Sequence, residues 1–129
     1  PTMKRTLITA IAMIATLGTQ ANAETLVAIN TDIGQVVAAG KNGMTLYTFR
    51  NDAANKSNCY NDCAQAWPPF TAGASAKAAG ALGIIDRTDG TRQWALNGQP
   101  LYFWAGDSAR GDATGDGVGG VWDVVRYGA

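Results

Sequence analysis

Residues 42–52 read Asn-Gly-Met-Thr-Leu-Tyr-Thr-Phe-Arg-Asn-Asp, and residues 97–107 read Asn-Gly-Gln-Pro-Leu-Tyr-Phe-Trp-Ala-Gly-Asp. The two stretches share the pattern N-G-x-x-L-Y-x-(F/W)-x-x-D at an offset of 55 (97 − 42 = 55). The same offset relates Trp67 to Trp122. A constant offset of this kind indicates an internal duplication. The sequence therefore predicts two related halves, whose equivalent motif residues are Tyr47 and Tyr102, Phe49 and Trp104, and Asp52 and Asp107.

Each copy of the motif belongs to a β-hairpin signal. Asn-Gly between apolar and aromatic runs favours a two-residue turn, because both residues tolerate positive φ. One short helical turn is expected near Cys59–Ala66, where two prolines follow Trp67 and end it. Strands are expected at residues 25–29, 35–39, 45–49, 83–86, 92–96, 100–104 and 121–127.

These elements predict a mostly β fold class. Two pseudo-equivalent antiparallel meander halves, about 24–78 and 79–129, would form one small sandwich or closed sheet. The Ala- and Gly-rich stretch 72–81 would link them. Neither half offers enough apolar surface to fold alone, so we expect one cooperative domain over residues 24–129.

Residues 1–23 have the pattern of a secretory signal peptide. Lys4 and Arg5 precede a short apolar run over residues 7–17, and Ala-Asn-Ala at 21–23 offers a cleavage site. The run is nearer a dozen residues than the roughly 20 that cross a bilayer, so no membrane span is expected after cleavage. Pro1 and Thr2 precede Met3, which we take as the natural start. A periplasmic or secreted location follows.

Composition excludes several functional classes. The chain has no His, which rules out His-ligated zinc or haem and any Ser-His-Asp or Cys-His pair. Its formal net charge is zero, so it has no basic surface for nucleic acid. In an oxidising compartment, Cys59 and Cys63 are expected to form a disulfide across a tightened turn. A redox-active pair or a soft-metal site remains the alternative.

The duplicated Tyr-x-(Phe/Trp)-x-x-Asp element resembles a bacterial secreted and lipoprotein repeat family of unknown function that is named for this motif. Flanking residues agree with that family, including Cys59, Cys63, Trp67 and Trp122. The chain departs from it in lacking the lipid-accepting Cys and in carrying Asp116 where Gln is more usual. The resemblance implies an exported protein of this architecture, but it implies no particular activity.

The motif residues permit two interpretations. In the structural one, the tyrosines and the aromatic residues two positions later pack across the interface between the halves, while the Asp side chains accept backbone N–H bonds in turns. In the functional one, Asp52 and Asp107 share a ligand or metal site. An Asp-dependent hydrolase using Asp52 with Asp107, or Asp112 with Asp116, is a further alternative, although no apolar pocket is evident that would separate their pKa values.

The Gly-rich loop at 107–120 suggests another site. Asp107, Asp112 and Asp116 could wrap an oxygen-coordinated cation such as calcium, but their spacing does not fit an EF-hand. In the second hairpin, Tyr102 and Trp104 share one strand face and Phe103 takes the other, so one face could be core and the other a binding surface. The leading hypothesis is an exported, non-catalytic β-domain that binds or scaffolds an unknown envelope ligand or protein and needs no cofactor.

Overall fold

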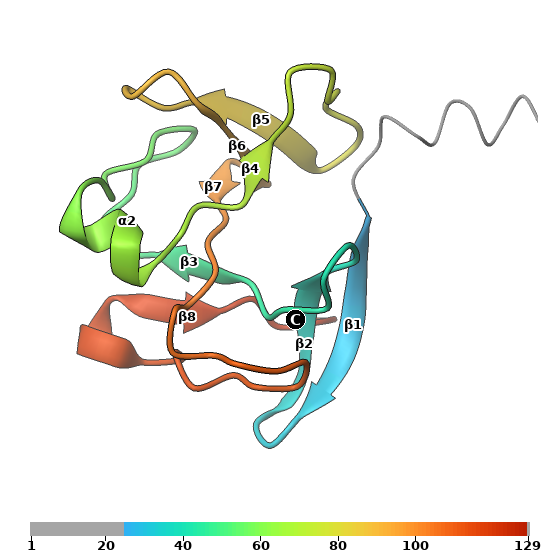
Figure 1. Ribbon diagram of the computed structural model, residues 1–129. Coiled ribbons are helices and arrows are strands. Elements are labelled where there is room, and N and C mark those ends of the chain that lie inside the picture. The colour runs from blue at the N-terminus through green and yellow to red at the C-terminus, as the bar shows by residue number, and fades with distance from the viewer. Residues whose placement is uncertain (1–24, 129) are drawn as a thin grey trace, which may run out of the picture.

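The computed structural model describes residues 25–128, and the predicted signal peptide therefore lies outside the described residues. Short antiparallel strands make up most of the described fold, which confirms the mostly β class (Figure 1). The elements in chain order are β1 (Leu26–Thr31), β2 (Gly34–Ala39), β3 (Tyr47–Phe49), α2 (Asp62–Ala66), β4 (Thr71–Ala72), β5 (Leu82–Asp86), β6 (Arg92–Leu96), β7 (Gln99–Pro100), η1 (Val118–Gly120) and β8 (Trp122–Val124).

The strands form three small sheets. β1 pairs with β2, β3 pairs with β8, and β4, β6 and β5 form a third sheet to which β7 adds by pairing with β6. In Figure 1 the third sheet lies at the top and the β1–β2 hairpin at the right, with β3 and β8 in the lower half. Within residues 25–128 no closed barrel forms, so the closed-sheet alternative is wrong.

Three predicted strands are wrong in extent, for the same reason. The strand expected at 45–49 is limited to β3, because Thr45 bridges to Ala38 of β2 whereas β3 pairs with β8. The strand expected at 100–104 stops at Pro100, because Tyr102 makes only isolated bridges, to Tyr47 and to Pro69. The strand expected at 121–127 is limited to β8, because Arg126 bridges to Val36 of β2 instead. In each of these places the chain changes its pairing partner after a few residues, and periodicity along the sequence does not report such a change.

The two halves meet in an approximate twofold arrangement. At its centre, the Tyr47 amide donates to the Tyr102 carbonyl and the Tyr102 amide donates to the Tyr47 carbonyl, both at 2.9 Å. Backbone hydrogen bonds farther out recur at the same sequence offset. Examples are Phe70 N to Leu101 O at 2.9 Å with Val125 N to Leu46 O at 3.0 Å, and Ala105 N to Ala66 O at 2.8 Å with Arg50 N to Val121 O at 2.7 Å.

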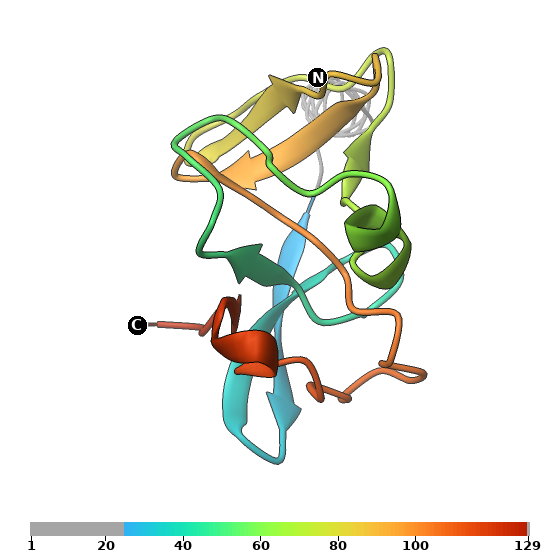
Figure 2. The same ribbon diagram turned by 90° about the vertical axis from the view of Figure 1, so that its left-hand side faces the viewer.

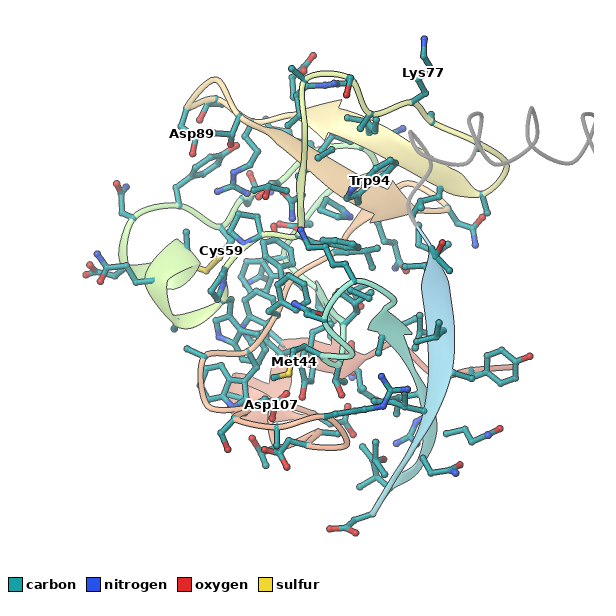
Figure 3. All side chains as sticks on the ribbon, turned by 45° about the vertical axis from the view of Figure 1, so that its right-hand side comes forward. Met44, Cys59, Lys77, Asp89, Trp94 and Asp107 are labelled. Carbon is teal, nitrogen blue, oxygen red and sulfur yellow. A yellow bond between two sulfur atoms is a disulfide. The ribbon has the colours of Figure 1, made fainter. Side chains whose placement is uncertain are left out.

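The core divides into two buried clusters, each containing residues from both halves. One surrounds Trp67 and Trp122 together with the motif tyrosines. The other surrounds Trp94 and Phe70, with Leu46 and Leu101 beside them. Trp94 is labelled in Figure 3 within the upper sheet, above the aromatic side chains that fill the centre. Phe103 packs against this second cluster, which places the other face of its hairpin in the core as well.

Cys59 and Cys63 form a disulfide beside α2, visible in yellow in Figure 3. Cys63 lies in the first turn of α2, and the Trp67 amide donates to its carbonyl at 2.8 Å. The bridge closes a very short loop, for which chain entropy gives about 2 kcal/mol of stabilisation. This short stapled helix brings Trp67 to the centre of the molecule.

Candidate functional site

Four aromatic rings stack in a column through the centre of the molecule. Trp67 and Trp122 form its middle, with ring centroids 3.9 Å apart and planes 5° apart. Trp104 stacks on Trp67 at 4.2 Å, and Phe49 stacks on Trp122 at the same distance. Each half thus contributes one late Trp to the middle and one motif aromatic residue to an end. The column fixes the motif strands relative to one another, since stacked pairs stabilise beyond their buried area.

Tyr47 carries the first of two tyrosine–aspartate pairs. Its buried ring meets Trp67 edge-on at 5.3 Å, and its hydroxyl donates to Asp107 Oδ2 at 2.6 Å. The Gly115 amide donates to the Tyr47 oxygen at 3.1 Å. The Thr114 amide and hydroxyl donate to Asp107 Oδ1 at 2.9 and 2.7 Å. Asp107 is only 8% exposed, so its carboxylate is enclosed, and both of its oxygens accept hydrogen bonds.

Tyr102 carries the second pair. Its ring meets Trp122 edge-on at 5.1 Å, and its hydroxyl donates to Asp52 Oδ2 at 2.7 Å. The Asn58 amide donates to Asp52 Oδ1 at 2.7 Å. The pairs therefore cross between the halves, each tyrosine binding the aspartate of the other motif. Asp52 differs from its counterpart in being only partly buried.

A hydrogen-bonded chain continues from Tyr102 into the interior. Ser57 Oγ lies 2.6 Å from the Tyr102 oxygen. Since the single Tyr102 hydrogen goes to Asp52, Ser57 is the donor in this contact. Arg87 Nη1 in turn donates to Ser57 Oγ at 2.9 Å. The chain therefore runs from a guanidinium through two hydroxyls to the Asp52 carboxylate, so neutral groups separate the two opposite charges.

Arg87 is a buried cation held mostly by neutral groups. It is 4% exposed, its Nη1 also donates to Gln93 Oε1 at 2.8 Å, and its guanidinium lies 4.3 Å from the centre of the Tyr60 ring. Within the described residues its Nε has no hydrogen-bond partner, and Asp89 Oδ2 is 3.6 Å away. The first half has no such cation, because the strand registers match Ile85 to Ile29 and so place Thr31 at the position equivalent to Arg87.

Burial affects the ionisation of these groups. It raises the pKa of Tyr47, and the hydrogen bond to Asp107 raises that pKa further. Burial also raises the pKa of Tyr102. Both hydroxyls therefore stay protonated and act as hydrogen-bond donors. Burial raises the pKa of Asp52, although the Asn58 amide and the Tyr102 hydroxyl oppose the shift. The arrangement provides rigid, directional hydrogen bonds rather than a mobile proton.

A surface pocket opens beside Asp52. It has a volume of about 230 Å³ and lies between the end of β3 and the turn that joins β6 to β7. Figure 2 shows the segment after β3 rising beside this turn, where the Asn55 amide donates to the Gly98 carbonyl at 2.7 Å. The residues of the wall that bear on its chemistry are Phe49, Arg50, Asp52, Asn97, Gly98 and Gln99.

The equivalent glycine in the other half is covered by a longer side chain. Gly43 corresponds to Gly98, and Arg110 corresponds to Asn55 (110 − 55 = 55). The Arg110 side chain packs so closely over Gly43 that a Cβ there would lie 3.3 Å from its Cγ and 3.4 Å from its Cδ. A Cβ on Gly98 would meet only the Asn55 amide, at 3.6 Å or more. A long side chain therefore lies over the turn glycine in one half, and a short one lies over it in the other.

The carboxylates predicted to bind calcium are not brought together. Asp112 Oδ2 accepts the Ser108 and Ala109 amides at 2.9 and 3.0 Å. Asp116 Oδ1 accepts the Val124 amide at 2.9 Å. Over residues 25–128, no group of three or more His, Cys, Asp or Glu side chains is placed to hold a metal ion. Each carboxylate instead fixes its own segment of loop.

The comparisons agree with this duplicated architecture. The family model of a secreted repeat of unknown function matches residues 27–71 and, a second time, residues 83–126. The chain belongs to this family. The two matches fall on the two halves that exchange tyrosine–aspartate pairs, and the resemblance noted from the motif is confirmed. No curated protein and no solved structure matches the chain. In the part of the chain described, every helix is too short or too polar to cross a membrane.

Sequence reasoning missed the residues that distinguish the two pairs in this family member. Ser57, Arg87 and Gln93 form the interior network, and Arg110 packs over Gly43. An Arg two residues before Asp-Gly is typical of an exposed turn, so burial of Arg87 carried no sequence signal. The duplication could have pointed to Arg110, because its counterpart Asn55 has a much shorter side chain.

Proposed function

We propose that the protein is an exported, non-catalytic β-domain of the envelope, periplasmic or secreted, that binds its ligand in the pocket beside Asp52. One observation carries the proposal. The same motif occurs twice, but Asp107 is enclosed, whereas Asp52 lines an open pocket of about 230 Å³. A purely structural role needs only the enclosed arrangement. Concave sites with a few fixed polar groups are where proteins bind small ligands.

The fixed carboxylates support a non-catalytic role. A general acid or base needs a group that reaches the substrate and exchanges protons near the working pH. Asp107 has both oxygens occupied and is shielded from solvent. Burial raises the pKa of Tyr102, so the hydroxyl nearest Asp52 does not supply a proton at neutral pH. Binding asks only that these groups keep their orientation.

Two walls of the pocket are also held in place by contacts within the protein. Phe49 is stacked on Trp122 at 4.2 Å with planes 14° apart, which holds one wall in place. The Asn55–Gly98 hydrogen bond ties the opposing turn to the loop after β3. A wall fixed before binding reduces the entropy that a ligand must overcome.

The test is an NMR titration of the exported protein with calcium, neutral sugars, short peptides and a haem-like dye. We expect at least one organic probe to shift the amide signals of Ala53, Ala54 and Gly98 saturably, and Asp52→Asn to weaken that effect. Asp86→Asn, an exposed carboxylate change on β5, is the matched control and should leave binding unchanged. Three results would overturn the proposal: no probe moving these signals, stabilisation by calcium alone, or turnover of a probe that Asp52→Asn abolishes in an intact fold.

A further inference from the structure

We infer that the pocket beside Asp52 is a subsite for one neutral pyranose ring, as found in envelope glycans; this rests on the proposed binding function. A pyranose ring has an apolar C–H face and a rim of hydroxyl groups that both donate and accept hydrogen bonds. A matching site needs a flat apolar wall together with carboxylate and amide groups at its rim. The pocket combines these features in a small space.

Phe49 provides the flat wall. One face of its ring is stacked on Trp122, and the ring also lines the pocket. The side chain is partly buried, so part of it stays open to a ligand. Because it ends the aromatic column, it cannot turn away without breaking the stack. A fixed aromatic surface suits the C–H face of a sugar.

Asp52 provides fixed acceptors, and two amides complete the rim. Each Asp52 oxygen accepts one internal hydrogen bond, from the Asn58 amide or the Tyr102 hydroxyl, which leaves lone pairs for a ligand hydroxyl. Asn97 and Gln99 are exposed, and their side-chain amides make no hydrogen bond within the described residues. These amides can both donate and accept, as the hydroxyl rim of a sugar requires.

Charge favours a neutral ligand over a charged one. Arg50 lines the pocket but is held by Asp123 through two hydrogen bonds of 2.8 Å. The negative charge of Asp52 is linked through Tyr102 and Ser57 to Arg87. Each charge at the pocket therefore has an internal counterpart, and a ligand need not supply one. The volume of about 230 Å³ is below the roughly 300–1,000 Å³ of drug-sized sites, so it fits one ring of a longer glycan.

The other half of the molecule suggests a substitution that would block the pocket. Arg110 packs over Gly43, which is equivalent to Gly98 of the pocket wall, and Asn55 is the counterpart of Arg110. Asn55→Arg should therefore place a long side chain over Gly98, as Arg110 lies over Gly43, and block the open pocket. Asn55 has a φ of 59°, so the longer residue is somewhat strained there. Gln99→Ala is the second variant, because this exposed side chain makes no internal contact on which folding depends.

The experiment titrates the exported protein with methyl glucoside and N-acetylglucosamine, with glucosamine as a cationic probe and glucuronate as an anionic one. NMR shifts of the Ala53, Ala54 and Gly98 amides are the readout. We expect saturable binding of a neutral sugar with a Kd on the order of millimolar, as for other ligands of this size. Gln99→Ala should weaken it at least about fivefold, and Asn55→Arg should abolish it; Asp86→Asn should not change it.

The outcomes separate the inference from the proposed function. If a charged probe moves the same amides and neutral sugars do not, the inference fails and the binding function stands. If no probe moves them, both fail. Sugar binding that persists unchanged in both Asn55→Arg and Gln99→Ala would place the sugar elsewhere and overturn the inference.

Discussion

The two tyrosine–aspartate pairs arise from the same motif but have different surroundings. Tyr47 and Asp107 lie in a closed environment. The Tyr47 hydroxyl and the Thr114 amide donate to the Asp107 carboxylate, and the Gly115 amide donates to the Tyr47 oxygen. Tyr102 and Asp52 share the same geometry, yet Asp52 is partly exposed and lies beside a pocket. The hydrogen bond between tyrosine and aspartate, which both pairs share, accounts for the fold. The exposure of Asp52 and the pocket beside it are the differences from which a separate role can arise. The enclosed pair can therefore serve as the reference with which the exposed pair is compared.

A second difference lies behind the pairs. Tyr102 is linked through Ser57 to the buried Arg87, while Tyr47 receives only a backbone amide. The second pair is thereby connected to a charge and to the segment around the disulfide, since Arg87 also donates to the Cys59 carbonyl at 2.6 Å. This network places a buried charge and its hydrogen-bond partners in one half of the molecule, while the backbone keeps its approximate twofold arrangement.

The largest expected difference between the pairs concerns their aspartates. Asp107→Asn should lower the free energy of unfolding by about 2–4 kcal/mol, because an amide cannot accept from both Tyr47 and Thr114 in a closed site. Asp52→Asn should cost about 1 kcal/mol or less, because solvent from the pocket can replace a lost partner. Urea unfolding of the two variants measures both values. Equal losses, or a larger loss at Asp52, would remove the distinction between enclosed and open pairs.

A smaller effect is expected from removing the buried cation. Arg87→Met should lower the free energy of unfolding by about 2 kcal/mol, because Ser57, Gln93 and Cys59 each lose a donor in the interior. Urea unfolding measures this loss. Hydrogen exchange should quicken at the Cys59 amide, which donates to Ser57, while the Gly115 amide beside Tyr47 keeps its protection. Loss of protection at both amides would show that the two pairs are not separately supported.

The smallest effect concerns pH. Burial raises the pKa of Asp52 above its ordinary value of 3.8, so the folded protein holds this proton more tightly than the unfolded chain. Asp52 therefore reduces stability as pH rises from 3.8 through its folded-state pKa. The Ser108 amide lowers the pKa of Asp112, and Arg50 lowers the pKa of Asp123. These two carboxylates stabilise the folded protein fully at a pH above their ordinary pKa. Their contribution to stability is lost as the pH falls through their folded-state pKa.

Carbon NMR of the side-chain carboxyl groups measures these titrations one by one. The pKa of Asp52 should lie above 3.8, and those of Asp112 and Asp123 below it. The stability difference between the wild type and Asp52→Asn should also change across the Asp52 transition and stay flat elsewhere. A folded-state pKa for Asp52 below 3.8 would mean that its hydrogen bonds outweigh its burial and that the pocket is wetter than the geometry indicates.

Local sequence patterns predicted much of the fold. The Asn97–Gly98 turn has φ of 52° and 84°, as expected for a two-residue hairpin turn. β1, β2, β5 and β6 lie where the strand runs predicted them, with only small differences at their ends. These elements depend on neighbours in the chain, so their signals are local.

The remainder depends on contacts between distant residues. Tyr102 leaves its strand to bond Tyr47, which belongs to the other copy of the motif. The crossing of the pairs also has no local signal, because Tyr47 and Asp52 share one motif yet bind different partners. Burial of Arg87 depends on three acceptors from two segments, Ser57 and Cys59 in one and Gln93 in the other. Periodicity and composition do not predict such contacts between residues that are distant in the sequence.

Double-mutant cycles on the four motif residues test the central claim most directly. Each tyrosine is changed to Phe and each aspartate to Asn, and coupling energies are obtained from urea unfolding. The crossed pairs Tyr47–Asp107 and Tyr102–Asp52 should each show coupling of about 1 kcal/mol or more. The pairs within one motif, Tyr47–Asp52 and Tyr102–Asp107, should add within about 0.5 kcal/mol. Coupling within the motifs, and none across them, would contradict the account.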